Sequence, residues 1–233
     1  MNEPRTYSSV SNAGDVLAQG FMTKVYAWMM LGLIITGGAA YVTSTSETLL
    51  SALIGRWTFI ILAIAEVGIV IYLSSRIMTM NPTTASVMFF VYALLNGLTL
   101  TPIMLIYTRE SISTAFFTTA AMFGAMSVYG TVTKRDLSSW GSFLMMGLVG
   151  LLVALLINMF VGSSRAELVI SIMGVIIFTG LTAYDTNRIR AMAREMRAGD
   201  DVRSNMAVMG ALKLYLDFIN MFLFLLRIFG KRR

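Results

Sequence analysis

Seven long apolar runs constrain the fold of this chain more than any other feature. They are Val25–Val42, Trp57–Leu73, Ala85–Tyr107, Ile112–Val132, Trp140–Val161, Leu168–Tyr184 and Met206–Leu226. Each run is 17 to 23 residues long, and a helix of about 20 residues crosses the hydrocarbon layer of a bilayer. The alternation typical of membrane barrels, whose strands have about 10 residues, is missing. The sequence therefore predicts an all-α integral membrane protein with seven transmembrane helices.

The composition agrees and excludes several classes of chemistry. Only 13% of the residues are charged, whereas a soluble domain carries about 25%. The chain has no cysteine and no histidine, which excludes disulfides, thiol nucleophiles, Cys/His zinc sites and a histidine general base. The net charge of +6 comes from basic residues between the apolar runs. This pattern is typical of membrane topology and does not call for a nucleic-acid partner.

The connections between the runs are short, so we expect one bundle rather than several domains. Residues 1–24 form a polar N-terminal segment, residues 25–230 a single seven-helix transmembrane domain, and residues 231–233 a basic tail. In the fourth run, two small-xxx-small pairs occur, Ala120 with Gly124 and Ala121 with Ala125. Such pairs let helix backbones approach closely, which predicts an interior position for this helix.

Lysine and arginine residues in the loops predict the orientation. Ten lie on the side of the N-terminus and three on the opposite side, which places the N-terminus in the cytoplasm. Those on the N-terminal side are Arg5, Lys24, Arg76, Lys134, Arg135, Arg188, Arg190, Arg194, Arg197 and Arg203, and those opposite are Arg56, Arg109 and Arg165. After seven full crossings the basic tail would lie on the side opposite the cytoplasm, which conflicts with this rule. A re-entrant last helix, which would leave the tail in the cytoplasm, is therefore the alternative to seven full crossings.

Four ionisable residues lie inside or at the edge of the runs: Glu66, Asp185, Lys213 and Asp217. A charge at the centre of a membrane helix costs roughly 2.5–3.5 kcal/mol on insertion scales, which makes intramembrane acids candidates for function. Asp217 is 11 residues into the last run and so about 16 Å deep. Lys213 is shallow enough to extend to the interface. Asn220 shares the face of Asp217 at spacing i+3.

Arg76 leaves the second run on the same side as Asp185, at a similar depth. An ion pair between the two is geometrically possible and would join the second and sixth helices. Alternatively, Asp185 caps the end of a helix and pairs with Arg188 at i+3. Both interpretations remain open at this point.

Four ordered segments resemble the Bax inhibitor family, also called the transmembrane BAX inhibitor motif family, and its bacterial branch most of all. They are Phe123–Gly130, Thr133–Leu137, Gly180–Arg188 and Leu214–Asn220, and the ending Leu-Arg-Ile-Phe-Gly at Gly230 fits as well. The resemblance begins at about Met22 and continues to the end of the chain. It implies a pH-sensitive calcium leak whose seventh helix stands at the centre of six others, in a bacterial inner membrane.

The resemblance also implies roles for individual residues. Asp185 in Ala-Tyr-Asp and Asp217 in Leu-Tyr-Leu-Asp match the family's pair of pH-sensing aspartates. Arg76 matches the second-helix arginine that latches one of them, and Glu66 matches the acid on the pore side. Together with Asn220, Glu66 and Asp217 are the expected ion pathway.

The gate can also be argued physically. Two carboxylates in one low-dielectric site titrate as a coupled pair, and without histidine such a pair is the most available switch near neutral pH. A change in the shared proton would release or secure the helix held by Arg76.

Calcium needs six to eight oxygen ligands for tight binding. Glu66, Asp185 and Asp217 therefore predict a weak, transient calcium site, with calcium as the permeant ion and no cofactor.

Three other classes of function compete with a calcium leak. A retinal protein would use Lys213 and a carboxylate on the third helix, but Ala85–Tyr107 contains no Asp or Glu. An intramembrane aspartyl protease would use Asp185 and Asp217 as a catalytic dyad; we expect no enzyme. The main alternative is a non-transporting regulator that binds another membrane protein, such as a protease or a partner in stress or cell death.

Overall fold

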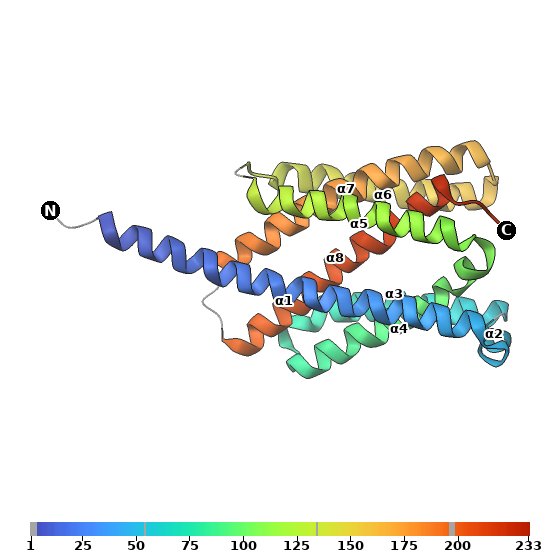
Figure 1. The fold of residues 1–233 in the computed structure, drawn as a ribbon, viewed down its shortest axis with the longest axis horizontal. Coiled ribbons are helices and arrows are strands. Elements are labelled where there is room, and N and C mark those ends of the chain that lie inside the picture. The colour runs from blue at the N-terminus through green and yellow to red at the C-terminus, as the bar shows by residue number, and fades with distance from the viewer. Residues whose placement is uncertain (1–3, 54, 134, 196–198) are drawn as a thin grey trace. The chain divides into compact units, whose positions relative to one another are not determined.

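The computed structural model describes residues 4–53, 55–133, 135–195 and 199–233, and it is 92% helical. Figure 1 shows the elements in chain order. They are α1 (Pro4–Thr45), α2 (Glu47–Leu53), α3 (Arg56–Arg76), the 3₁₀ helix η1 (Ile77–Thr79), α4 (Pro82–Ile106), α5 (Arg109–Val132), α6 (Ser138–Val161), α7 (Ser164–Glu195) and α8 (Asp200–Phe229).

Within these described ranges, seven helices are long and apolar enough to cross a membrane, which confirms the predicted fold class. Several of them extend well past the apolar runs, because charged side chains at a helix end can reach water while the backbone stays helical. The first span begins at Val16 and the sixth continues to Arg194. Gly162 ends α6 with a φ of 67°, a left-handed conformation that glycine adopts without strain.

The last span differs from the others in its burial. In its most apolar stretch α8 buries 72% of its residues, whereas the other six spans bury between 6% and 39%. A helix that is apolar on most of its circumference and largely buried is covered by protein rather than by lipid. The predicted place of this helix at the centre of six others stays a prediction.

The polar segment predicted over residues 1–24 is helical from Pro4 onward and supplies the first turns of α1. Residues 1–3 lie outside the described residues, as do Lys134 and Arg197 from the topology count. The side chains of Arg5 and Arg56 are also outside the description.

The chain forms two compact units. The first contains Met1–Leu105 and Ile189–Tyr215, and the second contains Ile106–Arg188 and Leu216–Arg233. The long helices α7 and α8 each contribute one part to both units. The single transmembrane domain predicted over residues 25–230 stays a prediction.

In the first unit, α1 and α4 approach closely at Gly97. A Cβ atom on Gly97 would lie 2.5 Å from the backbone oxygen of Thr36, so no larger residue fits without a shift. The Tyr215 ring from α8 packs edge-on against Phe89, with ring centroids 5.8 Å apart. Farther along, Asn205 Nδ2 donates a 2.8 Å hydrogen bond to the Met80 backbone oxygen. Backbone contact and aromatic packing thus hold α1, α4 and the first half of α8 together.

In the second unit, α5 and α7 approach closely at Gly130, where a Cβ atom would overlap the backbone oxygen of Ala183. Asn187 Nδ2 donates a 3.0 Å hydrogen bond to the Gly130 oxygen and fixes the same crossing. The expected close approach at Gly124 is wrong: among the described residues, no neighbouring atom lies within 4 Å of a Cβ placed there. The small residues that let helices touch lie one to two turns farther along α5.

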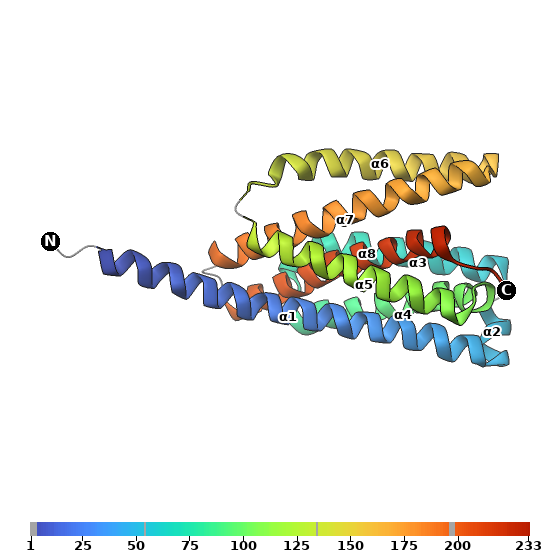
Figure 2. The ribbon, with the colours of Figure 1, turned by 45° about the horizontal axis from the view of Figure 1, so that its top comes forward.

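The C-terminal tail is bound to the turn between α4 and α5 (Figures 1 and 2). The Thr108 N–H donates to the Lys231 oxygen at 3.1 Å, and the Arg233 N–H donates to the Ile106 oxygen at 2.8 Å. The last span, Asp200–Phe229, is one helix of 30 residues and is long enough to cross a membrane. The choice between seven full crossings and a re-entrant last helix stays a prediction.

Candidate functional site

Glu66 lies in the middle of α3 and is half-buried. Its carboxylate accepts two hydrogen bonds from α4: Asn96 Nδ2 donates to Oε2 at 3.3 Å, and Thr99 Oγ1 donates to Oε1 at 2.7 Å. Asn96 and Thr99 are three residues apart, so both side chains lie on one face of their helix. Burying a polar group in a membrane costs free energy unless the group is hydrogen-bonded. The hydrogen bonds from Asn96 and Thr99 lower this cost for the Glu66 carboxylate.

The hydrogen bonds continue from Asn96 into the buried interior of the first unit. The Tyr215 hydroxyl donates to Asn96 Oδ1 at 3.2 Å and lies 2.6 Å from Thr36 Oγ1. Thr36 in turn reaches the backbone oxygen of Ala93 at 2.8 Å. We call Thr36, Glu66, Asn96, Thr99 and Tyr215 the Glu66 network. It joins side chains of α1, α3, α4 and α8 within one unit.

Arg76 is the last residue of α3, and its side chain is exposed. It belongs to the first unit, whereas Asp185 and Asp217 belong to the second. The latch between Arg76 and these aspartates, and the Arg76–Asp185 ion pair, stay predictions.

Both aspartates are buried in membrane spans of the second unit: Asp185 is 9% exposed and Asp217 is 4% exposed. The expectation that Asp185 caps a helix end is wrong, because α7 continues ten residues further to Glu195. Asp185 lies between Ala183 and Asn187, the two residues that fix α7 against Gly130 of α5. A closely packed helix crossing thus determines the position of this carboxylate.

The residue after Asp217 packs against aromatic rings. The next residue, Phe218, meets the rings of Phe116 and Phe123 of α5, each with a centroid distance of 5.6 Å and nearly edge-on geometry. Phe123 and Phe218 are buried, whereas Phe116 is 40% exposed. In a low-dielectric interior the charge on a carboxylate interacts strongly with other charges. This part of α8 therefore combines an acid with an apolar wall.

Asn220 is half-buried and donates a 2.8 Å hydrogen bond to the Leu216 oxygen of its own helix. Its role in an ion pathway stays a prediction. Lys213 is half-buried as well.

The described residues contain no group of three or more acidic, histidine or cysteine side chains that could hold a metal ion together. Glu66 lies in the first unit, and Asp185 and Asp217 in the second. The weak, transient calcium contact predicted for these three residues stays a prediction.

Three members of the Glu66 network were not predicted from the sequence: Thr36, Thr99 and Tyr215. A tyrosine or threonine inside an apolar run is usually packing, so neither stands out by residue type. The spacing of Asn96 and Thr99 at i and i+3 was the available signal, since it puts two polar groups on one face of an otherwise apolar helix.

Comparison with known proteins gives the family. The family model described as "Inhibitor of apoptosis-promoting Bax1" matches residues 18–233. The inner membrane protein YbhL of Escherichia coli K12 is 43% identical over 234 residues, which are 99% of this chain and 98% of that protein. A protein of Borreliella burgdorferi is 43% identical over 91% of this chain and 92% of its own length, and the protein RP147 of Rickettsia prowazekii is 41% identical over 98% and 96%. The chain therefore belongs to the Bax inhibitor family of integral membrane proteins.

Proposed function

We propose that this protein is a pH-sensitive calcium leak of the bacterial inner membrane, gated by Asp185 and Asp217 with Arg76 as the latch. The observation that carries the proposal is the burial of two aspartates in membrane-spanning helices of the same compact unit. The chain has no histidine to act as the switch. The inner-membrane location is supported by the name of the Escherichia coli relative.

The gate works through a shared proton. Two negative charges in a low-dielectric site repel each other, so a coupled pair releases its protons in two separate steps. The protonation state of the pair sets its net charge, and the net charge sets its attraction for the Arg76 guanidinium. Arg76 ends α3, so a change in this attraction moves or frees that helix. The gate is a two-state element biased by pH.

The same acids favour calcium as the permeant ion. Acidic side chains along a pathway attract cations and repel anions. Glu66, Asp217 and Asn220, with backbone carbonyls and water, offer few protein oxygens compared with the six to eight of a tight calcium site. Weak binding suits passage, because an ion that is held tightly leaves slowly. The protein acts without catalysis and without a cofactor.

The test is calcium flux into proteoliposomes of the purified protein between pH 5.5 and 8.5. Wild type is compared with Asp185→Asn and Asp217→Asn, and Asp136→Asn is the matched control because it changes the same charge in an exposed loop. We expect a pH-dependent flux whose midpoint shifts or disappears in the first two variants only.

Two results would contradict the proposal at different levels. A flux that keeps its pH dependence in Asp185→Asn and Asp217→Asn leaves the leak but removes the aspartates as its sensor. No flux above that of empty liposomes contradicts the leak itself. It would favour the alternative, a regulator that binds a membrane protease or a partner in stress or cell death.

A further inference from the structure

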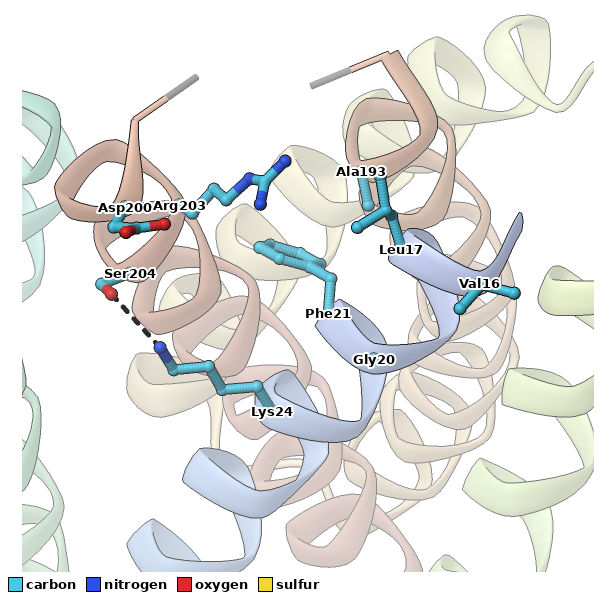
Figure 3. A pocket seen from close by; sticks show the side chains of 9 residues that line it. All are labelled: Val16, Leu17, Gly20, Phe21, Lys24, Ala193, Asp200, Arg203 and Ser204. Atoms are coloured by element: carbon cyan, nitrogen blue, oxygen red, sulfur yellow. Dashed lines mark hydrogen bonds between the residues drawn. The ribbon is translucent and has the colours of Figure 1, made fainter. Parts of the chain in front are cut away.

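A cavity of about 380 Å³ lies in the first unit (Figure 3). It is bounded by the first half of α1, the end of α7 and the first turns of α8. Its lining residues are Val16, Leu17, Gly20, Phe21, Lys24, Ala193, Asp200, Arg203 and Ser204.

The cavity lies where three membrane spans end. One span begins at Val16, the sixth ends at Arg194, next to Ala193, and the last begins at Asp200. The ends of membrane spans lie at the level of the lipid headgroups. The cavity therefore opens at the boundary between hydrocarbon and water, where phospholipid phosphates are found.

The polar side of the cavity carries a net positive charge. Lys24 and Arg203 are cations and Asp200 is an anion, so the lining sums to +1. Lys24 Nζ donates a 3.2 Å hydrogen bond to Ser204 Oγ, which leaves the hydroxyl hydrogen of Ser204 available to donate. Figure 3 shows the Arg203 side chain directed from α8 toward the space next to Phe21. Two cationic donors and a hydroxyl suit a phosphate oxyanion.

The opposite side of the cavity is apolar and open. Val16 is 69% exposed and Leu17 is 50% exposed. No neighbouring atom among the described residues lies within 4 Å of a Cβ placed on Gly20. The hydrocarbon layer lies on the other side of Lys24, where the apolar run begins at Val25. An anionic headgroup held at Lys24 and Arg203 can therefore extend its acyl chains directly into that layer, whereas a free phosphate would use only the cationic donors.

We propose that this cavity binds the headgroup of an anionic phospholipid. The phosphate accepts hydrogen bonds from Lys24, Arg203 and the Ser204 hydroxyl, and the acyl chains extend toward the apolar run that begins at Val25. Basic pockets between membrane helices bind anionic headgroups in this way. The proposal holds whether or not the protein conducts calcium.

The experiment is native mass spectrometry of the full chain in detergent, titrated with a short-chain phosphatidylglycerol or a phosphatidylcholine with the same acyl chains. We expect tighter binding of phosphatidylglycerol. Lys24→Ala and Arg203→Ala should each weaken it about fivefold, because a basic residue near an anionic lipid contributes about 1 kcal/mol and 1.4 kcal/mol is a factor of ten. Asp200→Asn should tighten it. Arg165→Ala, at the exposed opposite end of the sixth span, is the matched control and should leave it unchanged.

A second variant tests the cavity without changing any charge. Gly20→Met places a side chain in the open space and favours the helix. It should abolish phosphatidylglycerol binding while the melting temperature stays at or above that of wild type.

Three results would overturn the proposal. One is equal binding of both lipids, and another is unchanged binding in Lys24→Ala, Arg203→Ala and Gly20→Met. The third is displacement of phosphatidylglycerol by inorganic phosphate at millimolar concentration, which would assign the site to a free phosphate.

Discussion

The acids of the two units occupy different environments. In the first unit, Glu66 is half-buried and accepts hydrogen bonds from two neutral donors on one neighbouring helix. In the second unit, Asp185 and Asp217 are almost completely buried. Asp185 lies two residues from Ala183 at a close helix crossing, and Asp217 precedes Phe218, whose ring packs against Phe116. Neutral donors stabilise one fixed carboxylate. Two buried acids in one unit favour an element whose charge changes with pH.

The helices that carry these acids explain part of the difference. α3 buries only 6% of its most apolar stretch, whereas α8 buries 72%. Most of α3 therefore faces lipid, and Glu66 can find partners on one side only. Asp217 is 4% exposed, so protein covers it on nearly all sides. This difference favours ion contact for Glu66 and switching for Asp217.

The largest effect is expected in the calcium-flux assay, where variants of Glu66 and Asp217 should separate ion contact from pH switching. Glu66→Gln should reduce calcium flux by about tenfold or more, because a unit charge near a divalent cation contributes about 2 kcal/mol even in water. The pH midpoint should stay where it is in wild type. Asp217→Asn should remove the pH dependence. A shifted midpoint in Glu66→Gln would show that Glu66 also takes part in pH sensing, and its role would no longer differ from that of Asp217.

The next effect tests whether the Glu66 network depends on the close approach of α1 and α4. Gly97→Ala places a Cβ 2.5 Å from the Thr36 oxygen and 2.7 Å from the Ala39 Cβ. Overpacking of this kind costs about 1–3 kcal/mol, so thermal unfolding in detergent should occur at a lower temperature. Gly124→Ala, which meets no neighbour within 4 Å among the described residues, is the control. Equal melting temperatures for the two variants would mean that α1 and α4 can move apart without lowering the stability of the protein.

A smaller effect is expected at the centre of the network. Tyr215→Phe keeps the ring against Phe89 and removes the hydroxyl that reaches Asn96 and Thr36. The loss of a buried hydrogen bond costs about 1–2 kcal/mol, measured as reduced stability in the same unfolding assay. Tyr72→Phe is the matched control, because Tyr72 is 53% exposed and such a change is usually within about 0.5 kcal/mol. If Tyr215→Phe and Tyr72→Phe were equally stable, the hydrogen bonds of the Glu66 network would not contribute to stability.

The sequence was sufficient for features that depend on composition along one helix. The seven spans follow from run length, and Glu66, Asp185 and Asp217 stand out as acids among apolar residues. Features that depend on contact between helices were missed or misplaced. Tyr215 looks like packing until Asn96 lies opposite its hydroxyl. The close approach was expected at Gly124 and occurs at Gly130, because the residue that meets a neighbouring backbone depends on where two helices cross.

The smallest effect comes from an acid outside the membrane spans. The Ser138 hydroxyl and backbone N–H, the latter 2.8 Å from Asp136 Oδ1, hold the pKa of Asp136 below its ordinary value of 3.8. A lowered pKa means that the ionised carboxylate stabilises the fold above this value, and that this contribution is lost as the pH falls through the lowered pKa. Asp136→Asn keeps an acceptor oxygen, so its melting temperature should be slightly below that of wild type at pH 7 and equal to it at pH 2. Its flux should show the same pH profile as wild type. If the pH profile of flux shifted in Asp136→Asn, an exposed carboxylate would influence the gate. Burial would then no longer distinguish Asp185 and Asp217 from other acids.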